Sequence, residues 1–177
     1  MKLIVGLGNP EPDYRGTRHN LGRWCVEQVA AYLDLAPFQS NDKLGCTITR
    51  LDDADHHWFF AYPNSFMNES GVAVVKLVHF YRLELTDLLI IHDDVDVPFG
   101  AVRLVNDRGA AGHKGVASVI EQLKTQAFHR LRVGLGSNRD AKLPSEAYVL
   151  QKFTAEEQAA LTKVVPQVVE AILKWAR

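Results

Sequence analysis

The segment Leu88-Leu89-Ile90-Ile91-His92-Asp93-Asp94 gives the clearest indication of the fold class. Its first four residues form a continuous apolar run, which is typical of a strand buried on both faces at the centre of a sheet. The three polar residues that follow mark the expected end of that strand. Because both faces of such a strand need cover, the run predicts a sheet with helices on each side, which is an α/β fold.

Strand and helix patterns alternate on either side of this central run. Short apolar segments bounded by turn residues predict strands, and apolar residues recurring every three to four positions predict helices. The expected strands cover 2–7, 45–50, 58–62, 88–91, 102–105 and 131–135. The expected helices cover 21–33, 70–82 and 116–124, with a further helix from 154 onward. This order predicts a single domain over residues 1–177, built as a twisted mixed β-sheet flanked by helices, with a C-terminal helix.

Two of the helical segments carry more specific expectations. In the segment 70–82 the apolar positions that predict the helix are Val72, Val75, Val78 and Phe80. In the last helix Thr154 and Glu157 have the spacing of a capping box. Pro166 is expected to kink that helix, because proline removes a backbone donor from the helix interior.

The composition predicts a soluble globular protein. Of the 177 residues, 47% are hydrophobic and 23% are charged, which suffices for one substantial core. No signal peptide is visible, and no apolar run reaches about 18 residues, the rough minimum for a membrane-spanning helix. Cys25 and Cys46 lack the spacing of a redox pair, so a reducing compartment is the simpler interpretation. A cytoplasmic location is expected.

Positive charge gathers in one part of the chain. The formal net charge is −1, but residues 101–152 hold nine Lys and Arg against four acids, a local charge of +5. Taken alone, such a segment is most simply a solvated face. Together with other signs of a polyanionic ligand, it predicts contact with phosphate groups.

Polar residues near the ends of two expected strands indicate where chemistry takes place. Ligands of open α/β sheets bind beside the carboxyl ends of the strands. Asn9 follows the first strand, Asp93 belongs to the polar stretch after the central strand, and His19 lies at the start of the following helix. A carboxylate beside an imidazole is the arrangement of a general base with an orienting partner. With no activated Ser or Cys evident, the sequence predicts a hydrolase in which His19 activates water.

Other motifs are weaker or leave an alternative open. Gly6-Leu7-Gly8 is only a partial dinucleotide fingerprint, because Glu11 stands where the third glycine is needed. The Gly-x-Ser-x-Gly motif of many serine hydrolases is missing. The run His-Asp-Asp-Val-Asp at 92–96 has the residue types of a metal site. One working carboxylate, Asp93 or Asp94, is the favoured interpretation of that run, and metal-dependent hydrolysis is the alternative.

Five motifs resemble those of one known family. They are Gly6-Leu7-Gly8-Asn9-Pro10 with Tyr14, Thr17-Arg18-His19-Asn20-Leu21-Gly22, Phe66-Met67-Asn68-Glu69-Ser70-Gly71, His92-Asp93-Asp94-Val95-Asp96-Val97-Pro98 with Gly100, and Phe128-His129-Arg130-Leu131-Arg132-Val133-Gly134. Their order and spacing resemble the bacterial peptidyl-tRNA hydrolases over essentially the whole chain. The resemblance implies hydrolysis of the ester that joins a nascent peptide to the terminal ribose of tRNA. It also implies a monomer that needs no metal or cofactor, with peptidyl-tRNA as its partner and no membrane contact.

The resemblance implies roles for individual residues as well. The catalytic histidine corresponds to His19 and its orienting aspartate to Asp93. The residues implied in substrate binding are Asn9, Tyr14, Met67, Asn68 and Lys114. The residues implied in gripping the 5′-phosphate of tRNA are Arg103 and Arg132.

One position departs from the family pattern. Lys114, in Gly112-His113-Lys114-Gly115, stands where the family has a fourth substrate-contacting asparagine. Asparagine donates and accepts hydrogen bonds, whereas lysine only donates and adds charge. Lys114 is therefore expected either to stabilise an oxyanion or a phosphate, or to slow the reaction. Lys142 and Lys152 are further candidates for the RNA-binding surface.

The main alternative from a different functional class is a non-catalytic RNA-binding relative of the fold, of the kind that assists intron splicing in plastids. Such a relative has no need of a complete set of catalytic side chains. The presence together of His19, Asp93, Asn9 and Asn68 favours the enzyme.

Overall fold

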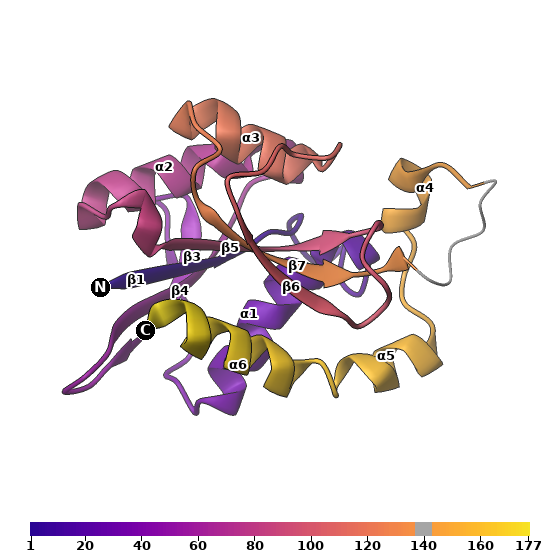
Figure 1. Cartoon of the computed structure of the whole chain (residues 1–177), viewed down its shortest axis with the longest axis horizontal. Helices are drawn as coiled ribbons and strands as arrows, with labels where there is room; N and C mark the ends of the chain where they lie inside the picture. The colour runs from indigo at the N-terminus through magenta and orange to yellow at the C-terminus, as the bar shows by residue number, and fades with distance from the viewer. Residues whose placement is uncertain (137–142) are drawn as a thin grey trace.

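A seven-stranded mixed sheet forms the centre of the molecule (Figure 1). The computed structural model describes residues 1–136 and 143–177. The strands are β1 Lys2–Gly6, β2 Gln39–Asn41, β3 Cys46–Asp52, β4 His57–Pro63, β5 Leu88–Asp94, β6 Val102–Asn106 and β7 His129–Gly134. Their order in the sheet is β2-β3-β4-β1-β5-β7-β6. β1 is parallel to β4 and β5, β5 is parallel to β7, and the other pairs are antiparallel. Of these, only the short edge strand β2 was not expected from the sequence.

Helices cover both faces of the sheet (Figure 1). The helices are η1 Arg18–Asn20, α1 Leu21–Tyr32, η2 Met67–Glu69, α2 Ser70–Tyr81, η3 Leu85–Asp87, α3 Lys114–Leu123, α4 Ser145–Val149, α5 Ala155–Leu161 and α6 Val165–Ala176, where η denotes a 3₁₀ helix. α1, α5 and α6 contribute to a core on one face of the sheet, and α2 and α3 contribute to a core on the other. The expected α/β class with a mixed sheet and a C-terminal helix is confirmed. Among the described helices, none has the length and apolar character needed to cross a membrane.

β5 is buried along its whole length and separates the two cores. Its apolar side chains alternate as expected of a central strand, with Leu88 and Ile90 on the α2 side and Leu89 and Ile91 on the α1 side. The polar triplet was expected to follow this strand, but the strand continues through it to Asp94. Because side chains alternate along a strand, Asp93 shares the α1 side with Ile91.

α2 is present where its apolar positions predicted a helix, but those positions do not all lie on its buried face. Val72 is 41% exposed and Phe80 is 64% exposed, whereas the buried apolar positions of the helix are Ala73, Val74, Leu77 and Val78. The segment has apolar residues on several sides, so their spacing alone does not identify the buried face. The neighbouring helix α3 determines which face of α2 is buried. The two helices pack so closely that a Cβ on Gly71 of α2 would lie only 2.2 Å from the carbonyl oxygen of Ser118 of α3.

The C-terminal segment contains two helices where the sequence predicted one. The capping box of Thr154 and Glu157 is present at the start of α5, as expected. The expected kink at Pro166 is wrong, because α5 ends at Leu161 and Pro166 lies in the first turn of α6. In that position proline removes a backbone donor that has no partner within the helix.

A buried ion pair joins this C-terminal segment to the turn before α1. Arg18 of η1 is only 5% exposed, and its Nη2 lies 2.6 Å from Oε2 of Glu157. Its Nη1 donates to the carbonyl oxygen of Lys152 at 2.8 Å. The rings of Tyr148 and Phe153 lie 4.6 and 5.4 Å from the guanidinium carbon. These contacts tie η1 to α4 and α5, which lie near the other end of the chain.

His92 is a second buried polar group, within β5. It is 3% exposed, and its Nδ1–H donates to the carbonyl oxygen of Asp93 at 2.7 Å. Burial and then the neighbouring His113 lower the pKa of His92 to about 3. His92 is therefore neutral in the folded protein at neutral pH.

We expect Arg18→Met to lower the free energy of unfolding by about 3–5 kcal/mol, because the Glu157 carboxylate would remain buried without a cation. Urea denaturation measures the loss. Arg15→Met is the control, since the Arg15 side chain is 78% exposed in its ion pair with Glu11, and surface pairs contribute at most about 1 kcal/mol. Equal losses in the two variants would contradict the structural role of the buried pair.

We expect the stability to fall in acid partly because of His92. Its pKa is about 3 when folded and about 6.5 when unfolded. At a pH between these two pKa values, the His92 imidazole is protonated in the unfolded state but neutral in the folded state. The free energy of unfolding therefore decreases as the pH falls. Between pH 7 and pH 5, His92 should account for a loss of up to about 2 kcal/mol in the free energy of unfolding. His92→Gln should remove this part of the loss. Urea denaturation of both proteins at the two pH values checks this, and identical pH dependence would refute it.

Candidate active site

A cleft of about 850 Å³ lies beside the carboxyl ends of β1 and β5. Its walls come from the loop after β1, η1, η2, the start of α3, and α4. The residues named from the sequence that line it are Asn9, Tyr14, His19, Met67, Asn68, Asp94 and Lys114. Parallel strands end at the same edge of a sheet, so segments far apart in the sequence meet here.

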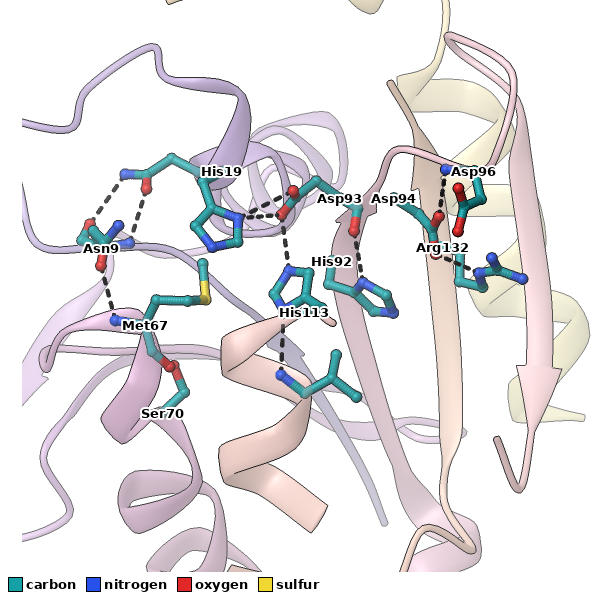
Figure 2. A network of polar contacts seen from close by, with 12 residues as sticks. Asn9, His19, Met67, Ser70, His92, Asp93, Asp94, Asp96, His113 and Arg132 are labelled. Carbon is teal, nitrogen blue, oxygen red and sulfur yellow. Dashed lines mark hydrogen bonds and ion pairs between the residues drawn. The ribbon is translucent and has the colours of Figure 1, made fainter. Parts of the chain in front are cut away.

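His19 and Asp93 form a buried pair at this cleft (Figure 2). Nδ1 of His19 lies 3.0 Å from both Oδ1 and Oδ2 of Asp93. His19 is 8% exposed and Asp93 is 2% exposed. Because the carboxylate can only accept, Nδ1 carries the proton. Nε2 of His19 therefore carries the free lone pair, which can accept a proton.

A close approach of α1 to the sheet brings these two residues together. A Cβ on Gly22 would lie 2.2 Å from the carbonyl oxygen of Ile91, so only glycine fits at this position. Gly22 follows His19 by one helical turn, and Ile91 precedes Asp93 by two residues of β5. The absence of a side chain at Gly22 thus permits the hydrogen bond between His19 and Asp93.

His113 is a second histidine on the same carboxylate (Figure 2), and the sequence interpretation gave it no role. Its Nε2 lies 3.0 Å from Oδ1 of Asp93, and its ring centroid lies 4.8 Å from that of His19. Burial acts to raise the pKa of Asp93, but His113 and His19 together hold it well below its usual range. The position of His113 just before α3 was visible in the sequence. Nothing local indicated that this helix start reaches the end of β5.

The structure also changes the set of potential metal ligands. Within residues 1–136 and 143–177, the one group with ligand atoms close enough, within 4.8 Å, is His19, Asp93 and His113. The cluster suggested by the sequence, 92–96, does not converge, because side chains alternate along β5 and Asp94 binds Arg132 instead. The contacts of Asp93 with the two imidazoles have the length of ordinary hydrogen bonds.

Asn9 is held rigidly at the rim of the cleft. Its backbone N–H donates to Oδ1 of Asn20 at 2.8 Å, and its carbonyl oxygen accepts from Nδ2 of Asn20 at 3.0 Å. Its side-chain Oδ1 accepts from the backbone N–H of Met67 at 2.8 Å. Among the described residues, none accepts a hydrogen bond from Nδ2 of Asn9. This amide is therefore an oriented donor in the wall of the cleft.

Arg103 and Arg132 lie outside the cleft lining, on the two strands at one edge of the sheet. They are register partners on β6 and β7, so their side chains share one face. Nε of Arg132 lies 2.6 Å from Oδ2 of Asp94, which itself lines the cleft (Figure 2). The hydrogen bond from Arg132 and the Asp96 backbone N–H outweigh burial and lower the pKa of Asp94. Asp94 thus connects Arg132 to the cleft.

Lys114 pairs across the cleft with a residue of α4. Its Nζ lies 3.2 Å from Oε1 of Glu146, and the two side chains are 59% and 78% exposed. Exposed pairs of this kind are weak, at most about 1 kcal/mol, so a ligand can displace Glu146. Of the two further lysines considered for RNA contact, Lys152 is exposed, and Lys142 lies outside the described residues.

Comparisons with known proteins identify the family. A family model described as peptidyl-tRNA hydrolase matches residues 3–177. The peptidyl-tRNA hydrolase of Mycolicibacterium smegmatis is 40% identical over 169 residues, covering 96% of this chain and 87% of that protein. The peptidyl-tRNA hydrolase of Pseudothermotoga lettingae is 38% identical over 172 residues, covering 97% of this chain and 88% of that protein.

A solved structure extends the similarity from sequence to fold. The crystal structure of the peptidyl-tRNA hydrolase of Acinetobacter baumannii matches with a TM-score of 0.85 and 32% identity. The match covers 99% of this chain and 92% of that one. The chain therefore belongs to the peptidyl-tRNA hydrolase family.

Proposed function

We propose that this chain hydrolyses the ester bond between peptide and tRNA in peptidyl-tRNA, releasing free tRNA for translation. The observation that carries the proposal is the buried His19–Asp93 pair at the cleft, in a chain of this family. An imidazole whose Nδ1–H is held by a carboxylate is oriented to act as a base through Nε2.

The proposed reaction uses water as the nucleophile. Nε2 of His19 takes a proton from water while the water oxygen attacks the ester carbonyl carbon. The carbonyl oxygen becomes negatively charged, and the side-chain amides of Asn9 and Asn68 donate hydrogen bonds to it. Collapse of this intermediate breaks the bond to the ribose oxygen, which receives the proton from the His19 imidazolium. Asp93 stabilises the imidazolium between these two steps.

The remaining residues of the cleft are proposed to bind the substrate. Tyr14 and Phe66 are in edge-to-face contact, with ring centroids 6.2 Å apart, and with Met67 they form an apolar wall suited to the peptide. Lys114 is proposed to contact an anionic group of the substrate after leaving Glu146. No step in this scheme requires a metal or a cofactor.

Arg103 and Arg132 are proposed to bind the 5′-phosphate of tRNA. Two guanidinium groups on one face of neighbouring strands suit a phosphate, because guanidinium binds phosphate oxygens in a bidentate manner. The proposed enzyme is a cytoplasmic monomer acting as one domain over residues 1–177. The cleft of a single chain is lined by Asn9, His19 and Asn68, the side chains proposed to contact the water and the ester.

We expect His19→Ala to lower kcat for peptidyl-tRNA cleavage by about 10²–10⁴-fold, because the general base is lost. Asp93→Asn should lower kcat at least about tenfold, since a neutral amide stabilises the imidazolium less. His79→Ala, which removes an exposed histidine of α2, is the matched control and should retain activity. Full activity in His19→Ala would exclude the proposed mechanism.

The same assay separates the alternatives. Activity lost in EDTA and restored by a divalent ion would indicate a metal-dependent hydrolase. A wild-type chain that binds tRNA but cleaves nothing would indicate the non-catalytic RNA-binding relative. Cleavage gained only in Lys114→Asn would show that the lysine at this position prevents the reaction.

We expect Arg103→Ala and Arg132→Ala to weaken tRNA binding and to make it less dependent on salt. Each lost phosphate contact should reduce the slope of log K against log salt by about 0.7–0.9. Lys174→Ala serves as the control, because this exposed lysine lies in the last turn of α6. Binding measured by fluorescence anisotropy at several salt concentrations gives the slopes. Slopes equal to that of the wild type would rule out both arginines as phosphate contacts.

A further inference from the structure

The tautomer of His113 is fixed by two contacts on opposite sides of its ring (Figure 2). His113 is the N-cap residue of α3, and its Nδ1 accepts a hydrogen bond from the backbone N–H of Val116 at 3.2 Å. Because Nδ1 accepts, the proton of the neutral ring is on Nε2. That nitrogen lies 3.0 Å from Oδ1 of Asp93, so it donates to the carboxylate.

The two histidines use the Asp93 carboxylate differently. His19 Nδ1 is equally distant from both carboxylate oxygens, at 3.0 Å, so this contact alone does not fix the rotation of the carboxylate. The His113 bond reaches only Oδ1. His113 itself cannot shift easily, because its side chain is 8% exposed and its ring packs against those of His19 and His92, with centroids 4.8 and 4.7 Å away.

We propose that His113 is a positioning residue for the hydrolysis, which anchors the Asp93 carboxylate through Nε2–H and so sets both the orientation and the basicity of His19. This inference rests on the proposed function of His19 and Asp93. His113 itself need not touch the substrate to have this effect.

The effect on basicity follows from the charge of Asp93. A carboxylate that accepts from two donors attracts the proton of the His19 imidazolium less than one that accepts from a single donor. Without the His113 donor, His19 would keep its proton up to a higher pH.

Other charged groups near the pair are already engaged. His92 is buried and neutral, and Asp94 is paired with Arg132. Lys114 is paired with Glu146 at the mouth of the cleft. On the η1 side, Arg18 is paired with Glu157.

Replacement of His113 by asparagine separates its two contacts. Asparagine is among the best N-cap residues, so His113→Asn keeps an acceptor for the Val116 N–H. Its shorter side chain removes the donor to Asp93. His113→Ala removes both contacts and should in addition lose about 1 kcal/mol of stability, which is about a fivefold change in the folding equilibrium.

We expect His113→Asn to unfold like the wild type while kcat falls by about 10–100-fold with little change in KM. The acidic limb of the profile of kcat/KM against pH should move upward by roughly half to one unit. In an Asp93→Asn background, His113→Asn should cause no further shift of the limb. A wild-type kcat and pH profile in His113→Asn would overturn the inference.

An NMR titration of the His19 ring without substrate tests the anchor independently of activity. The titration midpoint in His113→Asn should move upward relative to the wild type. An unchanged midpoint overturns the inference even if His19 is essential for cleavage. A shifted midpoint in a protein whose His19→Ala variant still cleaves would support the anchor and refute the proposed function.

Discussion

The buried carboxylate of Asp93 is the group on which the site depends. It lies at the end of the central strand and is 2% exposed, and its described ion-pair partners are the imidazoles of His19 and His113. A buried charge is costly unless hydrogen bonds compensate it. The compensating donors come from η1 and from the start of α3, elements that pack near opposite faces of the sheet. The need to satisfy one carboxylate therefore fixes the relative positions of β5, η1 and α3.

Close packing of the backbone makes this arrangement possible. Gly22 lets α1 approach the end of β5, and Gly71 lets α2 approach α3. Neither contact leaves room for a Cβ, so the close approach of the backbones at each position depends on glycine. Two residues without side chains thus help to place the elements around the site. The rigid support of Asn9 by Asn20 has the same consequence on the other side of the cleft.

The sequence was sufficient where the information is local. A continuous apolar run identifies β5, and the rule that ligands lie at strand ends brings Asn9, His19 and Asp93 to one edge. The buried face of α2 and the break before α6 depend on neighbouring helices, which no local pattern describes. His113 and the Arg18–Glu157 pair depend on contacts across long sequence separations, 139 residues in the case of Arg18 and Glu157. A short motif cannot specify such partners.

The ion pair between Arg18 and Glu157 also has a consequence for how the protein is made. The side chains proposed to act on the ester all lie between Asn9 and His113, in the first two thirds of the chain. The contacts that hold the His19 turn come from Tyr148 to Glu157. Synthesis proceeds from the N-terminus. A partly synthesised chain on the ribosome therefore carries the side chains proposed for catalysis before it has the segment that fixes the His19 turn, and the site is complete only after residue 157 has been added.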